Sequence, residues 1–463
     1  MNENPDLQRR RFMKGLAITA GASSLLATQG KLQLISNALA ADYAGLNDYK
    51  SLVCVFQGGG NDAINMFAPY TQAAYQDYAS IRQALAIPRN QLHPVSGEQH
   101  GFHPSMRDVR DLYNSGALAT VADVGNLFRP TSLDDYRNRN RIPPDLFSHS
   151  HQTEIWQTNQ PPNVGSSLPG WGGLVADLLD TANANTGLPP SFSMAGNNFW
   201  LSGNVTQPFD VATGGIKDFG DLEDSTYPSW ASSRASAWNK ILNLSQNHVL
   251  KAQTADTIRM ARLRIAAIVG ALDEAPEIAP FSGQGGLGHQ LRMAARLISI
   301  REALGMKRQF FFVKIGGWDT HGNQLPTHAD LLTQLNDALH YFYQTTQQLG
   351  VADSVTTFTA SEFGRSLTSN GDGTDHAWST QHLVMGDAVR GGQIHGEIPT
   401  MEIGGQKDAV DEGGIPGGRL IPEYSVDQYG ATLAKWLDVT DADLSVIFPN
   451  LDNFSVRDLG FMS

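Results

Sequence analysis

The sequence has little cysteine, little charge and no long apolar segment. Its 463 residues include one cysteine, Cys54, so an intrachain disulfide is excluded. Charged residues make up 17% of the chain, which excludes a long, highly charged disordered arm. Acidic residues outnumber basic residues by 46 to 33, and the formal charge of −13 repels nucleic acids and anionic membranes. We therefore expect no nucleic-acid partner.

The N-terminus has the pattern of a bacterial export signal. Three consecutive arginines lie within residues 8–14, an uncharged run covers 15–30, and a small-residue site ends at Ala40. This order resembles the signal read by the twin-arginine translocase, and it predicts that residues 41–463 are periplasmic or secreted. The apolar run is shorter than the roughly 20 residues of a membrane span, so we expect no stable span in the mature protein. An amphipathic N-terminal helix and a retained anchor are the alternatives.

Five short β-branched runs in the rest of the chain predict strands. Polar, mostly glycine-containing segments follow these runs, which cover residues 51–56, 117–124, 309–315, 354–359 and 381–385. Near-continuous apolar strands favour a mostly parallel sheet that is buried on both faces. Helical periodicity between the strands, notably over residues 328–349, then predicts a three-layer α/β/α fold. In such folds ligands bind beyond the carboxyl ends of the strands.

Two further regions have distinct patterns. Residues 161–230 are rich in Gly, Pro, Ser and Asn, and 229–272 has a helical pattern. We expect about 161–290 to form an insertion or cap beside the core. The stretch 427–438 predicts a helix that packs on the sheet.

Acidic residues and histidines follow the predicted strands. Asp319 and His321 come directly after one strand, Glu362 follows another, and Asp375 and His376 form a further pair. Carboxylate and imidazole donors together suit zinc, manganese or iron, so these residues predict a metal site at one rim of the sheet. The alternatives are a helix-capping Asp beside an incidental histidine, or residues that orient metal ligands without binding the ion.

Other residues at the predicted rim have open roles. Asp62 follows three glycines, and it is either a ligand or the N-cap of the next segment. Ser148 begins a predicted helix, where its hydroxyl either caps the helix or acts as a nucleophile. At least one of His149 and His151 is a possible ligand. Arg365 follows Glu362 by three residues and could pair with it or receive an anionic oxygen.

In these motifs the chain resembles the DUF1501 family. The matching motifs are Gly58-Gly59-Gly60-Asn61-Asp62, Ser148-His149, Gly317-Trp318-Asp319-Thr320-His321, Ser361-Glu362-Phe363-Gly364-Arg365 and Gly373-Thr374-Asp375-His376. The family's fold is taken to be similar to that of the alkaline phosphatase and sulfatase superfamily. The resemblance implies that Asp62 is the metal ligand after the first strand, and that Ser148 is the nucleophile candidate. It also implies that Asp319 and His321 form a later ligand pair.

The resemblance leaves the last ligand pair open between residues 361–364 and Asp375-His376. No Cys/Ser-x-Pro-x-Arg motif is present, which disfavours a sulfatase with a formylglycine nucleophile.

These observations predict an exported, metal-dependent hydrolase of phosphate or sulfate esters, acting on a small-molecule or glycan ester. The expected cofactor is a divalent ion, with Zn, Mn and Ca as candidates. The expected ligands are Asp62, His149, Asp319, His321, Glu362, Asp375 and His376. The expected catalytic residues are Ser148, Glu362 as ligand or base, and Arg365 as the group that steadies the oxyanion. The alternative is a non-catalytic binding or assembly protein that retains the fold.

Overall fold

The computed structural model describes most of the chain after the predicted export signal. The described residues are 43–97, 99–162, 168–183, 187–216, 230–243, 249–281, 285–409 and 417–463. The predicted signal over 1–40 therefore lies outside them. Among the helices within these ranges, none has both the length and the apolar character to cross a bilayer.

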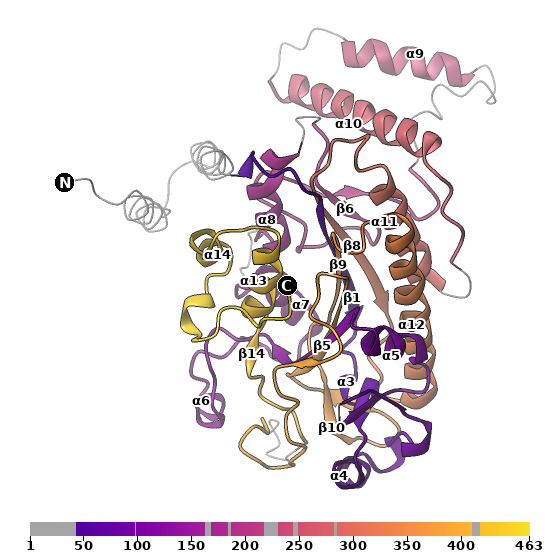
Figure 1. Cartoon of the computed structure of the whole chain (residues 1–463). Coiled ribbons are helices and arrows are strands. Elements are labelled where there is room, and N and C mark those ends of the chain that lie inside the picture. Colours follow the sequence, from indigo (N-terminus) through magenta and orange to yellow (C-terminus); the bar gives the residue numbers. More distant parts are fainter. Residues whose placement is uncertain are drawn as a thin grey trace.

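A central sheet runs through the molecule (Figure 1). Within the described residues it has nine strands, in the order β13-β5-β12-β9-β1-β8-β6-β7, and β14 also pairs with β5. Strand β12 runs antiparallel to its neighbours β5 and β9, and the other pairs are parallel, which confirms the predicted mostly parallel sheet. The strands are β1 (Lys50–Gly58), β5 (Leu118–Gly125), β6 (Ser191–Ser193), β7 (Phe209–Asp210), β8 (Arg308–Gly316), β9 (Val355–Ala360), β12 (Thr380–Met385), β13 (Ile394–His395) and β14 (Tyr424–Ser425).

Helices cover both faces of this sheet and complete the predicted three layers. The alternation of side chains along β1 sends Val53 and Val55 into one buried cluster, and Leu52, Cys54 and Phe56 into another. Burial raises the pKa of the Cys54 thiol, as expected of a structural cysteine. The first cluster packs against α5 (Arg107–Asn114), α11 (Gly285–Ser299) and α12 (Gln324–Gln348), and the second against α7 (His149–Thr158), α8 (Trp171–Leu179), α13 (Val426–Trp436) and α14 (Asp441–Ile447).

The region of about 161–290 differs from the expected insertion or cap. Strands β6 and β7 extend the central sheet, and Trp171 and Val175 of α8 are fully buried in the core. These elements are short and lie among glycine and proline residues, so periodicity alone does not reveal them. Helices α9 (Trp230–Asn243) and α10 (Val249–Glu274) extend beyond the sheet at the top of Figure 1.

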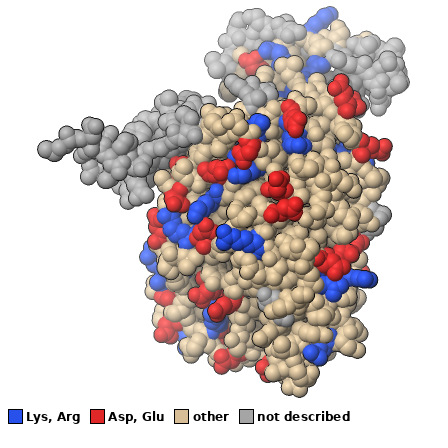
Figure 2. Space-filling view, in the orientation of Figure 1, with Lys and Arg blue, Asp and Glu red and all other residues tan. Residues whose placement is uncertain are grey.

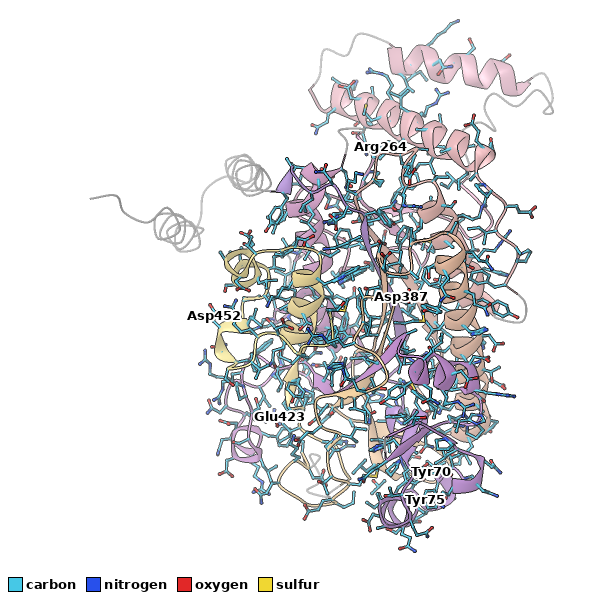
Figure 3. All side chains as sticks on the ribbon, in the orientation of Figure 1. Tyr70, Tyr75, Arg264, Asp387, Glu423 and Asp452 are labelled. Atoms are coloured by element: carbon cyan, nitrogen blue, oxygen red, sulfur yellow. The ribbon has the colours of Figure 1, made fainter. Side chains whose placement is uncertain are left out.

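Smaller elements complete the edge at which the sheet strands end. The short strands β2 (Phe67–Pro69), β4 (His100–Phe102) and β3 (His93–Pro94) form one small sheet, and β10 (Arg365–Ser369) pairs with β11 (Thr374–His376). Side chains fill the space between these elements and the helices (Figure 3).

On the face shown in Figure 2, acidic and basic residues are interspersed among uncharged areas. The helices near the edge at which the sheet strands end are α3 (Ala63–Met66), α4 (Gln72–Arg82) and α6 (Leu133–Arg137).

A buried carboxyl group at the start of α13 makes stability depend on pH. Desolvation raises the pKa of Asp427 to about 7, although hydrogen bonds from Asn450 and Ser425 oppose this shift. The unfolded carboxyl group has a pKa near 3.8, so the folded chain holds the extra proton between pH 4 and pH 7. Because the folded state binds more protons in this range, the Asp427 contribution to stability falls as the pH rises.

We therefore predict that Asp427→Asn removes this pH-dependent loss. Relative to wild type, the variant should gain up to about 4 kcal/mol in unfolding free energy between pH 4 and pH 7, at about 1.4 kcal/mol per pKa unit. Urea unfolding of both proteins at four pH values in this range tests the prediction. Parallel stability curves for the two proteins would contradict it.

Candidate metal centre

Three adjacent strands deliver the polar loops to one edge of the sheet. Strand β1 lies between β8 and β9, with Gly58 level with Gly316 and Phe56 level with Ala360. The chain can pass between these ends because residue 59 is glycine. Gly59 has a φ of +127°, and a Cβ on it would lie 2.4 Å from the backbone nitrogen of Asp319. The loops after β1 and β8 are therefore in direct contact.

The β10–β11 hairpin packs on the turn that follows β8. A Cβ on Gly373 would lie 2.3 Å from the carbonyl carbon of His321, so glycine allows this close approach. The backbone nitrogen of Thr374 also donates to the carbonyl oxygen of Thr320 over 3.1 Å. These contacts place His376 of β11 beside Asp319 and His321.

Three histidines turn the same ring nitrogen toward the carboxylate of Asp319. His376 Nε2 lies 3.0 Å from Asp319 Oδ1, and His321 Nε2 lies 3.1 Å from the same oxygen. His149, the first residue of α7, places its Nε2 3.3 Å from Asp319 Oδ2. The Nε2 atoms of His321 and His376 are 2.9 Å apart. His149, Asp319 and His376 thus bring ligand atoms within 4.8 Å of one another, and His321 lies beside Asp319 and His376.

The opposite nitrogen of each histidine is held by an acceptor. The Nδ1 atom lies 2.9 Å from Glu362 Oε1 in His149, 3.1 Å from Asp375 Oδ1 in His321, and 2.8 Å from the carbonyl oxygen of Phe147 in His376. Carboxylate and carbonyl oxygens only accept, so each Nδ1 carries the hydrogen, and each neutral ring has its lone pair on Nε2. Those lone pairs face the Asp319 carboxylate. This is the arrangement of histidines that bind a metal through Nε2.

The ionisation of these groups fits the same arrangement. Burial alone would raise the pKa of Asp319, but the hydrogen bond and the positive charge of Arg365 lower it to about 2. Desolvation lowers the pKa of His376, which keeps that ring neutral, whereas the hydrogen bond to Glu362 raises the pKa of His149. An ionised carboxylate that faces imidazole lone pairs is electrostatically unfavourable until a cation lies between them. The residues therefore fit a metal ion.

Arg365 holds Asp319, and its side chain is fully buried, so the structure exposes none of its donors to a substrate oxyanion. Its fully buried side chain donates to Asp319 Oδ1 over 2.8 Å and to the carbonyl oxygen of Gly59 over 3.3 Å. Its other nitrogens donate to the backbone oxygen and the hydroxyl of Thr374. The structure thus corrects the expected oxyanion role, because Arg365 fixes the orientation and charge of Asp319 instead.

Glu362 and Asp375 each contact a histidine of the cluster through Nδ1, and neither belongs to the group whose ligand atoms lie within 4.8 Å of one another. Glu362 is 4% exposed, and its Oε1 accepts from the backbone nitrogen of Gly59 over 2.8 Å as well as from His149. Asp375 Oδ1 accepts from Asn370 over 2.8 Å and from His321. Both had been expected as ligands, and Glu362 also as a base. The spacing of acids and histidines along the chain cannot distinguish a residue that binds a metal from a residue that holds a metal-binding histidine in place.

Asp62 lies apart from the histidine cluster, contrary to the role implied by the resemblance. Its buried carboxylate forms an ion pair with Arg82, accepts from Gln324 Nε2, and caps α3 through Asn65. Gln324 Oε1 in turn accepts from the hydroxyl of Thr374 over 2.6 Å, and Thr374 holds Arg365. Asp62 thus reaches Asp319 only through a chain of hydrogen bonds. Sequence reasoning missed Gln324 and Arg82, because polar residues in helices usually lie on the surface.

Ser148 stands at the N-cap of α7, next to His149. Its hydroxyl makes no capping hydrogen bond, and it lies 3.3 Å from the hydroxyl of Ser150. His151, the alternative ligand on α7, turns toward Asp145 with Nδ1 2.7 Å from Oδ2. Of the two α7 histidines, His149 is therefore the one in the cluster.

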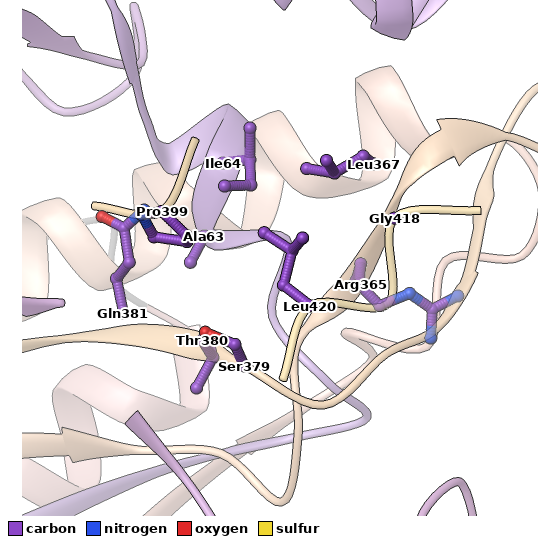
Figure 4. Close-up of a pocket in the computed structure, with 10 residues that line it drawn as sticks. All are labelled: Ala63, Ile64, Arg365, Leu367, Ser379, Thr380, Gln381, Pro399, Gly418 and Leu420. Carbon is purple, nitrogen blue, oxygen red and sulfur yellow. The ribbon is translucent and has the colours of Figure 1, made fainter. Parts of the chain in front are cut away.

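A small cavity lies behind Arg365, and it is too small for a substrate (Figure 4). Its volume of about 10 Å³ leaves room for at most about one water molecule. In the close-up the guanidinium group of Arg365 points away from the apolar lining residues Ile64 and Leu420. We therefore look for the substrate on the other side of Arg365, where Asp319 is 43% exposed.

Asp375 offers a test of the histidine orientation. We predict that Asp375→Ala lowers metal affinity by about 10- to 100-fold, because His321 loses the acceptor that fixes its ring. Competition with a chelator of known affinity measures this change. His151→Ala is the matched control and should leave the affinity unchanged; equal affinities in both variants would contradict the orienting role.

Comparison with known proteins gave one family and several distant structural likenesses. The chain is similar to Ps i-CgsB in complex with k-i-k-neocarrahexaose, with 11% identity, a TM-score of 0.35, and 88% of this chain and 77% of that chain covered. It is also similar to the lipoteichoic acid synthase LtaP from Listeria monocytogenes, with 8% identity, a TM-score of 0.35, and 88% of this chain and 78% of that chain covered. The PsFucS1 sulfatase from Pseudoalteromonas sp. is similar with 9% identity, a TM-score of 0.33, and 80% of this chain and 68% of that chain covered. TM-scores this low support no conclusion about function.

The sequence comparisons agree with the motifs. No functionally curated protein matched the chain. The model of the family described as "Protein of unknown function (DUF1501)" matches residues 49–412, which is more than half of the chain and includes every residue of the histidine cluster. The chain belongs to the DUF1501 family.

Proposed function

We propose that His149, Asp319, His321 and His376 bind a divalent cation, and that the protein hydrolyses phosphate or sulfate esters there. The observation that carries this proposal is the common orientation of the three histidines, each with Nε2 toward Asp319 and Nδ1 toward an acceptor. Three imidazoles and one carboxylate suit zinc or manganese. They disfavour calcium, which prefers an all-oxygen set.

The proposed reaction uses the exposed side of this cluster. The side chains of Asp319 and His321 are 43% and 45% exposed, so an ester group can reach them. A bound divalent ion would offset charge on the ester oxygens and lower the pKa of a nearby hydroxyl. Arg365 keeps Asp319 ionised, and Glu362 and Asp375 keep the imidazole rings in place. These positioning contacts exist before any substrate binds.

Ser148 is the nucleophile that we propose. Its hydroxyl oxygen would attack the phosphorus or sulfur atom and lose its proton, while the bond to the leaving ester oxygen breaks and that oxygen takes up a proton. Water would then release the phosphate or sulfate from Ser148. The support is its position beside His149 and its hydroxyl, which is not used to cap α7.

We further propose that the reaction takes place outside the cytoplasm. The support is the arginine-containing pattern of residues 1–40, which is typical of clients of the twin-arginine translocase. Fusion of this segment to a reporter, with its arginines replaced by lysines as the control, tests the route.

Metal content and turnover together test the proposed function. Elemental analysis of the purified protein should find bound zinc or manganese, and the metal-loaded protein should hydrolyse 4-nitrophenyl phosphate or 4-nitrophenyl sulfate. His376→Ala should lose both metal and turnover, whereas His151→Ala should keep both. A folded protein without metal would favour a binding protein that retained the fold. Bound metal without turnover of either ester would favour a structural metal site.

A further inference from the structure

A large pocket lies between the sheet and α7. Its volume is about 490 Å³, within the size range of small-molecule sites. Its walls come from the ends of β1 and β8, from one face of α7, and from the loop over residues 195–208. None of the residues assigned above to the metal cluster lines it. The pocket is therefore available to another part of the substrate.

The lining of the pocket is polar but almost uncharged. Asn197, Gln207, Ser202 and Thr153 line it, together with phenylalanines such as Phe199. Neutral donors and acceptors beside flat apolar surfaces suit a molecule that carries many hydroxyl groups on a carbon ring.

Lys314 is the one charged residue in this lining. No carboxylate lines the pocket, although acidic residues exceed basic ones in the chain. Lys314 is exposed, its Nζ lies 5.9 Å from the ring centre of Phe56, and it forms no ion pair with any residue that the structure describes. An unpaired cation in an otherwise neutral pocket attracts an anionic group.

Gln157 supplies a second polar group that is built into the pocket. Its side chain is 2% exposed, and Oε1 accepts from the backbone nitrogens of Phe199 and Trp200 over 2.9 and 3.0 Å. These bonds fix the amide, and its Nε2 donates to no residue in the described part of the chain. Because Gln157 lines the pocket, this held donor is available to a ligand.

The pocket adjoins the histidine cluster along two elements. Thr153 follows His149 by one turn of α7, which is about 6 Å along the helix axis. Lys314 precedes Asp319 by a few residues on β8. The Cε atom of Lys314 lies 2.8 Å from the position that a Cβ on residue 58 would take. The glycine at this position therefore leaves space for the lysine side chain. A substrate with its ester group at the cluster can therefore place its next ring in the pocket.

We infer that this pocket receives the leaving group of the ester, and that the leaving group is a sugar-like polyol with a carboxylate or a second anionic group that pairs with Lys314. The inference rests on the proposed hydrolase function and names its substrate class. Gln157 Nε2 binds a hydroxyl of the same ring. Lys314 is a specificity residue in this scheme, because it touches the substrate far from the reacting atoms.

Matched sugar esters test the inference. The probes are the 3-O-phosphate and 3-O-sulfate esters of glucuronic acid and of glucose, which differ in having a carboxylate or a hydroxymethyl group. Lys314→Met should lower kcat/KM for the glucuronic acid ester by about tenfold, mainly through KM, and leave the glucose ester within about twofold. Lys314→Arg, which keeps the charge, should stay within about threefold of wild type. Metal content should be the same in all three proteins.

Binding of free glucuronic acid separates this inference from the proposed function. Saturation-transfer NMR on the metal-loaded protein should show that glucuronic acid binds better than glucose, and that Lys314→Met removes the difference. If this holds while no ester is hydrolysed, the hydrolase function fails and the pocket assignment stands. If esters are hydrolysed but Lys314→Met changes both sugars equally or neither, the pocket assignment is overturned.

Discussion

Replacement of Asp319 by asparagine is expected to remove both bound metal and ester hydrolysis. Asp319 is the one residue that all three histidines face, and its two oxygens are divided between His149 on one side and His321 and His376 on the other. Asparagine keeps the shape and still accepts a hydrogen bond from Arg365, but it lacks the negative charge. We expect metal affinity to fall by more than the roughly 10- to 100-fold typical of an orienting residue. We expect kcat/KM to fall at least about 100-fold.

The measurement is metal content after dialysis, together with turnover of the best 4-nitrophenyl ester. Asp372→Asn is a suitable control, because Asp372 lies in the turn of the β10–β11 hairpin and accepts from the backbone nitrogen of Asn323 over 2.9 Å, and the structure describes no contact of its side chain with a histidine of the cluster. It should keep metal and activity. Full metal content in a folded Asp319→Asn protein would contradict the assignment of Asp319 as the shared ligand.

The sequence predicted the sheet well because its strands are strongly apolar. The five predicted strands are β1, β5, β8, β9 and β12, and the turns after β1 and β8 carry the residues expected at the rim. Short β6 was not found, since three residues give no measurable periodicity. What a pattern of residues predicts best is thus the buried part of the fold.

Several residues named from the sequence lie together in the structure, but the sequence did not resolve what each of them contacts. Sequence reasoning named His149, Asp319, His321 and His376, and it left open that some acids orient ligands. It could not tell that Glu362 and Asp375 face Nδ1 atoms, because the choice depends on ring orientations set by tertiary contacts. Arg365 was assigned to an oxyanion, because nothing in the chain order shows that the fold buries its side chain and turns it toward Asp319, Thr374 and Gly59.

Asp62 shows most clearly that an aspartate named as a metal ligand can instead form an ion pair inside the fold. The family resemblance implied a metal ligand at this position. Here the side chains of Asp62 and Arg82 are both fully buried and form an ion pair, and the structure describes no contact of Asp62 with a histidine of the cluster. A ligand role and a structural role make opposite predictions for metal content and for stability.

We expect Asp62→Asn to destabilise the fold by about 3–5 kcal/mol, because it leaves the Arg82 guanidinium buried without its counter-ion. A ligand variant would lose its metal, whereas this variant should keep the metal content of the wild type when it is folded. Denaturant unfolding and elemental analysis on the same sample measure both quantities. The double variant Asp62→Asn/Arg82→Met removes the unpaired charge, so it should recover a large part of the lost stability. Loss of metal from a stably folded Asp62→Asn protein would instead return Asp62 to the ligand set.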